Sequence, residues 1–308
     1  MVPVLFALLA ALSYGASDYA GGLAAREASV LQLTILAEAA SLTVVLLVVP
    51  WMSSQTPTAG SVIWGAAAGI SGVVGALSLY MGFRNEAFNV ASSLSAVGSA
   101  VFAVLAGLLF GERPGQLSIL GIGLAVLAII AVSASSSERA RNPRDHRDRG
   151  GERIGDGRTA GNQATGRHAA GVIWGLVAGA GFAGLFIGLN RAGSSRDFWP
   201  LVSAQLAALV AATSVAAWTR TLRRPSGRTC WLAVLTGVTG AVGVICYFLA
   251  SHAGLLAVVA VITSLYPAAT IVLARVLLGE RLTPIRIAGL CLAGASVGLV
   301  AVGGAGHG

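Results

Sequence analysis

Charged residues are scarce in this sequence, and lysine is absent from it. Only 10% of the 308 residues are charged, 56% are hydrophobic, and all 20 basic residues are arginine. A soluble globular protein needs more polar surface than this composition supplies. The composition therefore argues against a soluble domain and indicates a membrane protein that crosses the bilayer several times.

Residues that carry metal or nucleophile chemistry are also few. The cysteines lie in or beside apolar runs without paired spacing, which argues against a disulfide framework and a zinc site: Cys230, Cys246 and Cys291. The histidines are scattered along the chain: His146, His168, His252 and His307. No HExxH, GxSxG, GxxxxGK[ST] or CxxC motif is present, so we expect no catalytic residue, no metal and no cofactor.

The net charge of +8 is concentrated in two places. The tract 135–168 contains eight arginines and five acids, and the loop 220–228 contains four arginines. Charge placed in this way does not suggest a nucleic-acid partner. The tract 135–168 is polar and rich in Gly and Ser, which predicts a disordered linker. A docking tail or a contact with anionic lipid is the alternative.

Ten continuous apolar runs are long enough to cross a bilayer, which takes about 20 helical residues. Continuous apolarity without alternation predicts helices rather than barrel strands. Because the first run has a counterpart at 172–190, we expect it to be a span and not a cleaved signal peptide. The runs are 3–24, 30–50, 61–83, 88–110, 116–134, 169–190, 198–219, 231–251, 255–278 and 284–303.

An internal repeat relates the two ends of the chain. The triplet Gly-Glu-Arg occurs at 111–113 and again 168 residues later at 279–281, and aligning 91–125 with 259–293 gives 12 identities in 35 positions. The repeat defines two five-span halves, 1–134 and 169–308, joined by the linker 135–168. An odd number of spans inverts the second half, so we expect an all-α membrane protein with ten transmembrane helices as two inverted five-helix repeats, an architecture typical of secondary transporters.

Two segments connect this layout with a known family. Leu94–Arg113 reads LSAVGSAVFAVLAGLLFGER, and Ile262–Arg281 reads ITSLYPAATIVLARVLLGER, in which 264–267 matches a Ser-Leu-x-Pro pattern. With its two five-span halves, the chain resembles the EamA family of the drug/metabolite transporter superfamily. The resemblance implies a ten-helix carrier for small organic solutes, often an exporter, with a central cavity lined partly by the fourth and ninth spans.

The orientation in the membrane has two interpretations. Outside the linker, eight arginines fall on the linker side of the membrane and three on the side of the termini. The positive-inside rule therefore favours external termini, whereas the family resemblance implies cytoplasmic ones. The second span also carries Glu38 where similar proteins usually have an arginine.

Two acids inside apolar spans are the first candidates for a functional role, because a charge there costs at least ~2.5–3.5 kcal/mol. Asp18 and Glu38 lie roughly 9 and 12 Å below the same membrane face, at 1.5 Å per helical residue. At a shared depth they could exchange a proton or balance a cationic solute. The alternative is a structural role, in which each carboxyl is neutral or bonded to a neighbouring hydroxyl or carbonyl.

Spans four and nine supply further candidates. Their small polar side chains are expected to line a cavity or to pack helices closely: Ser95, Ser99 and Thr263. Pro267 cannot donate a hydrogen bond to the carbonyl of Thr263, which predicts an interruption of span nine. Three aromatic residues could provide a stacking or cation-π surface for an organic solute: Tyr14, Phe182 and Tyr266.

Charged residues near the ends of spans four and nine allow two interpretations. Glu112 and Glu280 follow glycines that end these spans, so they are expected to cap helices or to form a gating salt bridge. Arg275 is expected to reach the membrane surface or to act as a buried counter-ion.

We therefore expect a secondary transporter that moves a small organic metabolite or drug-like solute across the cytoplasmic membrane by alternating access. Proton coupling through Asp18 or Glu38 is one option. The alternatives are a flippase for a lipid-linked substrate and a membrane scaffold without transport activity.

Overall fold

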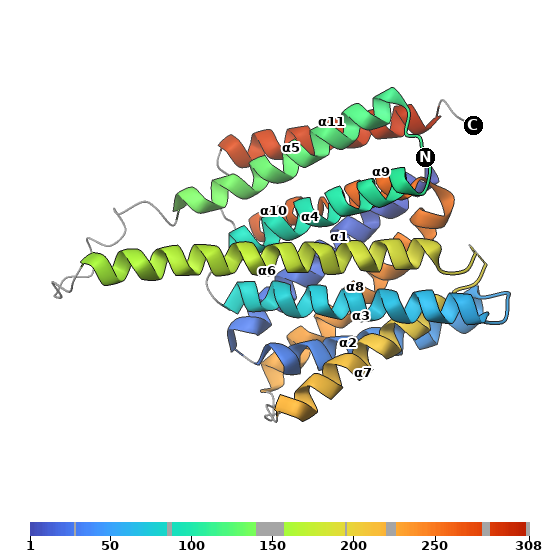
Figure 1. The fold of residues 1–308 in the computed structure, drawn as a ribbon, viewed down its shortest axis with the longest axis horizontal. Coiled ribbons are helices and arrows are strands. Elements are labelled where there is room, and N and C mark those ends of the chain that lie inside the picture. Colours follow the sequence, from blue (N-terminus) through green and yellow to red (C-terminus); the bar gives the residue numbers. More distant parts are fainter. Residues whose placement is uncertain are drawn as a thin grey trace.

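In the computed structural model, the chain folds into a bundle of helices that run approximately along one axis (Figure 1). The structure describes residues 1–27, 29–84, 88–139, 157–194, 196–219, 226–278 and 284–305. Within these ranges the helices are α1 (Val2–Glu27), α2 (Val30–Met52), α3 (Ala59–Arg84), α4 (Phe88–Leu109), α5 (Gln116–Arg139), α6 (Gly157–Arg191), α7 (Trp199–Thr219), α8 (Gly227–Ala253), α9 (Leu256–Thr263), α10 (Tyr266–Leu278) and α11 (Pro284–Ala305).

Six of these helices are long and apolar enough to cross a membrane, namely α1, α2, α3, α6, α7 and α8. Four shorter apolar segments complete the set: Leu94–Leu109, Gln116–Ala131, Leu256–Thr270 and Ile287–Val302. Large apolar side chains are exposed along the bundle, among them Leu47, Leu109 and Trp218. Exposure of this kind suits contact with lipid rather than with water. The chain is a multi-pass membrane protein.

Each expected span corresponds to helix, with one interruption. The run 255–278 is divided into α9 and α10 at Ser264 and Leu265, three and two residues before Pro267, which the sequence marks as a helix breaker. The equivalent span of the first half, α4, is continuous. Only one of the two halves therefore has a broken fourth helix.

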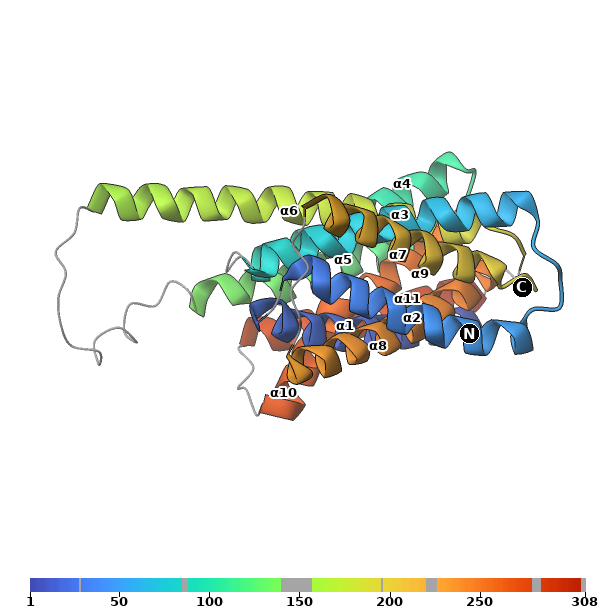
Figure 2. The ribbon, with the colours of Figure 1, turned by 90° about the horizontal axis from the view of Figure 1, so that it is seen from below.

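Helices extend into both ends of the segment 135–168 that was expected to be a disordered linker. Helix α5 continues to Arg139, and α6 begins at Gly157, so that α6 extends beyond the neighbouring helices (Figure 2). Residues 140–156 lie outside the described part of the chain. Low apolar content shows that a segment cannot bury a core, but a helix that is already nucleated in the membrane extends through polar residues at little cost.

Helices of the two halves pack against each other in matching pairs. If α1, α2 and α3 correspond to α6, α7 and α8, the pair α1 with α8 matches α6 with α3, and the pair α2 with α8 matches α7 with α3. Helices α5 and α11, which end the two halves, pack together. Helix α1 begins and α11 ends at the same end of the bundle, whereas α6 begins at the opposite end (Figure 1).

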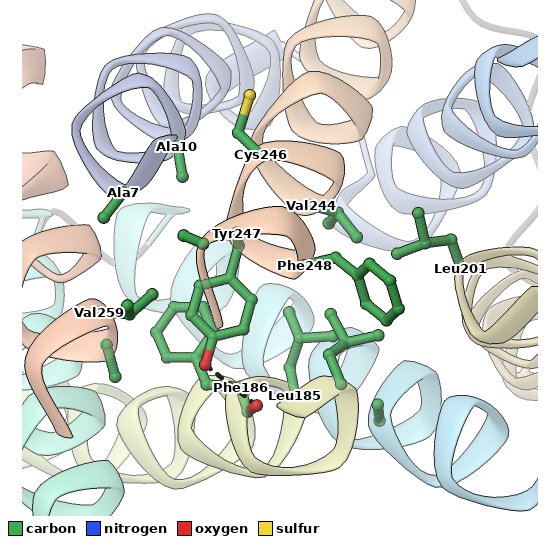
Figure 3. Packing of buried hydrophobic residues seen from close by; sticks show 14 of the residues in the cluster. Ala7, Ala10, Leu185, Phe186, Leu201, Val244, Cys246, Tyr247, Phe248 and Val259 are labelled. Atoms are coloured by element: carbon green, nitrogen blue, oxygen red, sulfur yellow. Dashed lines mark hydrogen bonds between the residues drawn. The ribbon is translucent and has the colours of Figure 1, made fainter. Parts of the chain in front are cut away.

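The core of the bundle contains a stack of aromatic rings between α6 and α8. The rings of Phe186 and Tyr247 lie 4.4 Å apart at 23°, and the Tyr247 hydroxyl donates a hydrogen bond of 3.1 Å to the Phe186 carbonyl (Figure 3). Both side chains are almost fully buried. This stack fixes α6 of the second half against α8 beside the cavity described next.

Candidate functional site

A cavity lies at the centre of the bundle, where the first three helices of each half meet. About 100 Å³ of its volume is open to water, which corresponds to about three molecules at ~30 Å³ each. Drug-sized ligands occupy cavities of about 300–1,000 Å³, so the cavity in this conformation holds only a very small solute. Its lining is Tyr14, Ser17, Asp18, Ala37, Glu38, Ser41, Gly69, Gly72, Val73, Ala76, Tyr80, Phe182, Leu185, Gln205, Ala208, Thr236, Gly237, Gly240 and Val244.

The two acids expected to share a depth both line this cavity. Asp18 stands nine residues before the end of α1 and Glu38 eight residues after the start of α2, which places them about 14 and 12 Å from the α1–α2 connection. Asp18 is only 9% exposed. Within the described part of the chain, neither carboxyl forms a hydrogen bond or an ion pair. Of the two forms of the structural alternative, the described contacts therefore support no hydrogen-bonded carboxyl, and the neutral carboxyl is the form that stays open.

Polar side chains from four helices surround the two acids. The Ser17 hydroxyl of α1 donates to the Thr236 carbonyl of α8 at 2.9 Å, and the Gln205 amide of α7 donates to the Ser41 hydroxyl of α2. Sequence reasoning did not select Ser41, Gln205 or Thr236. The available signal was that Gln205 is an amide within an apolar span and that Ser41 follows Glu38 by three residues, on the same helix face.

Aromatic rings form part of the cavity wall. Tyr14 and Phe182, which occupy equivalent positions in the repeat, both line it, and Tyr80 of α3 adds a third ring. The Tyr14 hydroxyl is buried without a hydrogen-bond partner. The Tyr14 ring also packs against the cluster that contains Leu265 and Tyr266. Tyr14 therefore stands between the cavity and the break of span nine.

The candidates in spans four and nine form a second cluster at this break, apart from the cavity lining. The hydroxyls of Ser99 and Ser264 lie 2.9 Å apart, and the Tyr266 hydroxyl donates to the Ser95 hydroxyl at 3.1 Å. The Thr263 hydroxyl is buried without a partner. Pro267 follows in the first turn of α10. This cluster joins α4 of the first half to both sides of the break.

Helix α1 connects the cavity with the same break. The Thr270 hydroxyl of α10 donates to the Gly15 carbonyl at 3.1 Å. A Cβ atom at Gly15 would lie 2.9 Å from the Tyr266 carbonyl oxygen and 2.7 Å from the Ala269 Cβ. Because only hydrogen fits at this position, α1 and α10 approach closely. A shift of α1 at Asp18 would therefore displace α10 next to the break.

Glu112 binds the beginning of the helix that ends at the break. Its carboxylate accepts hydrogen bonds from the Leu256 amide at 2.6 Å and the Ala257 amide at 2.9 Å. These amides belong to the first turn of α9, where backbone N–H groups have no helical partner. Gly111 allows the preceding turn, because its φ of 86° suits glycine.

The other residues expected to take part in gating are Glu280 and Arg275. Glu280 lies outside the described residues, and the side chain of Arg275 lies outside the described side chains. Among the described residues, the partners of Glu112 are backbone amides and no arginine. Glu112 is therefore a cap on a helix of the other half.

Comparisons with known proteins agree with this fold. Several solved structures match this chain, 23 chains in all. One of them, a crystal structure, has a TM-score of 0.73 and covers 97% of this chain and 98% of that chain at 12% identity; at this identity the likeness shows the fold alone. No curated protein matches the sequence. The EamA-like transporter family matches twice, at residues 1–134 and 169–302. The chain belongs to the EamA-like transporter family.

Proposed function

We propose that this protein is a secondary transporter of a small organic solute in the cytoplasmic membrane, with the central cavity as its solute site. The observation that carries the proposal is the pair Asp18 and Glu38 in a cavity to which each half contributes three helices. A carboxyl without an ion pair or hydrogen bond is unfavourable in a membrane interior. Its retention there favours a role in binding solute, protons or both.

The proposal includes two inverted repeats that open the cavity alternately to each membrane face. The matching helix pairs and the opposite starting ends of α1 and α6 support this relation between the halves (Figure 1). In such transporters, one bundle moves against the other around a fixed central site. The break between α9 and α10 offers a place where that movement changes backbone angles locally.

A solute carrier fits the cavity better than a flippase does. A flippase needs a polar groove that opens sideways to lipid, whereas the polar side chains here lie between six helices. Asp18, Ser41, Gln205 and Thr236 are all buried. The solute would therefore be enclosed by protein during its passage.

The proposal is tested in proteoliposomes that contain a pH-sensitive dye in the lumen. A panel of small amines, alcohols, carboxylates and amino acids is added outside, and proton movement is recorded for each. We expect at least one solute to move protons in wild type but not in Asp18→Asn or Glu38→Gln. Tyr19→Phe, next to Asp18 but absent from the cavity lining, should behave as wild type. Wild-type proton movement in both acid variants would refute their role in coupling. Because a solute can cross without protons, the proposed transport would be refuted if none of the solutes, added in radiolabelled form, entered or exchanged across the proteoliposome membrane.

A further inference from the structure

The cavity chemistry identifies a class of solute. We infer that the cavity binds a small organic cation, such as an amine or a quaternary ammonium ion. The inference rests on the proposed function, because it specifies what that same site carries. It depends on the charges, the aromatic walls and the size of the cavity.

Among the described residues, the carboxyl groups of the cavity lining have no basic side chain beside them. Asp18 and Glu38 supply these carboxyls, and none of the described lining residues is basic. Asp18 is 9% exposed and has no hydrogen-bond or ionic partner among the described residues. An anion would meet two carboxyls with no compensating positive group, whereas a cation would supply the missing counter-charge.

The remaining lining favours an organic cation over a bare metal ion. Rings of Tyr14, Tyr80 and Phe182 line the same cavity as the two acids, and aromatic faces attract alkylammonium groups. Alanine, valine, leucine and glycine make up much of the remaining wall. Of its other polar side chains, the Ser17 and Thr236 hydroxyls donate to backbone carbonyls and the Ser41 hydroxyl accepts from Gln205, which leaves few free oxygen ligands of the kind that hard metal ions require. The cavity has room for about three water molecules, which limits the cation to a few heavy atoms.

The test compares ligands of equal shape and different charge. Tetramethylammonium and tert-butanol each have five heavy atoms in a tetrahedral arrangement, but only the first is charged. The thermal stability of the purified full-length protein in detergent is measured against concentrations of each ligand, with sodium chloride at matched ionic strength. We expect an apparent Kd for tetramethylammonium at least tenfold below that for tert-butanol, and no comparable stabilisation by sodium.

Two variants test whether the preference for tetramethylammonium over tert-butanol arises in the cavity. Asp18→Asn should reduce the preference for tetramethylammonium at least tenfold, while Tyr19→Phe on the same helix should keep it. Equal affinity for the two ligands, or equal stabilisation by sodium chloride, would overturn the inference. The wild-type comparison decides the question even if Asp18→Asn fails to fold.

The outcomes also separate this inference from the proposed function. Proteoliposomes loaded with tetramethylammonium and, separately, with the neutral solutes of the panel are assayed for exchange. If a neutral solute exchanges saturably and tetramethylammonium neither binds nor exchanges, the cation inference fails and transport stands. If tetramethylammonium binds but no solute crosses the membrane, the proposed transport fails and the binding site stands.

Discussion

Replacing Glu112 with glutamine should weaken the contact between the two halves of the protein at one end of α9. The carboxylate accepts from two backbone amides, at 2.6 and 2.9 Å, and hydrogen bonds to a charged group contribute about 1.5–3 kcal/mol each. Glutamine keeps one oxygen acceptor but turns an NH₂ group toward the second amide. We expect a loss of about 2 kcal/mol, near the upper range for a helix N-cap.

The assay is thermal unfolding of the purified protein in detergent. One kcal/mol corresponds to about 2–4 °C in domains of 150–250 residues, so Glu112→Gln should lower the melting temperature by at least about 4 °C. Hydrogen exchange at the Leu256 and Ala257 amides should accelerate in the same variant. Arg113→Gln, a change at the exposed neighbour, should shift stability by less than about 0.5 kcal/mol. Equal shifts in both variants, or unchanged exchange at α9, would refute the capping argument.

Three further substitutions test separate contacts. Since Glu280 is the repeat equivalent of Glu112 and residues 88–89 are the equivalents of 256–257, Glu280→Gln should accelerate exchange at the first amides of α4; unchanged exchange would mean that the two caps are not equivalent. Gly15→Ala should destabilise the folded protein by about 1–3 kcal/mol through overpacking against α10. The control Gly60→Ala should leave stability unchanged, because nothing lies within 4 Å of the added Cβ. Equal melting temperatures of the two variants would contradict the close approach of α1 and α10. Tyr247→Phe should lose about 1 kcal/mol and keep transport, because the stacked ring remains; loss of transport would give the hydroxyl a functional role.

The positions of the helices could be predicted from the sequence because lipid imposes a simple rule. A span must be apolar for about 20 residues and must satisfy its own backbone hydrogen bonds. Depth follows from residue counting, so Asp18 and Glu38 could be placed at similar levels before the structure was known. Pro267 likewise indicated the interruption of span nine, since proline cannot donate a backbone hydrogen bond.

The rotation of each helix about its own axis could not be predicted in this way. Nearly every face of an apolar span is suited to lipid, so the hydrophobic pattern does not mark the face that turns inward. Close packing of small residues sets that rotation, and it directs Gln205, Ser41 and Thr236 into the cavity. The sequence also did not identify the hydrogen-bond partner of Glu112, because the first turn of α9 lies 144 residues further along the chain.

Helix α9 is held at both ends by the first half of the protein. Glu112 binds its first turn, and the Ser99 hydroxyl lies 2.9 Å from the hydroxyl of Ser264, the residue that caps its C-terminal end. Helix α10 instead contacts α1 through Thr270 and Gly15, and α1 carries Asp18 into the cavity. A change in the cavity would therefore move α10 relative to α9, with the break between them as the hinge.

A covalent link between Ser99 and Ser264 tests whether α9 stays with the first half while α10 moves. Their hydroxyls are close enough that Ser99→Cys with Ser264→Cys should form a disulfide of about 2.05 Å with small adjustments, after the native Cys230, Cys246 and Cys291 have been replaced. We expect oxidation to leave solute exchange intact, because α9 stays with α4 while α10 moves, and we expect tetramethylammonium still to stabilise the oxidised protein. The single-cysteine variants, treated with the same oxidant, should keep exchange. Loss of exchange on oxidation, reversed by a reductant and absent from the single-cysteine variants, would show that α9 also moves against α4, and the hinge would then have to lie elsewhere.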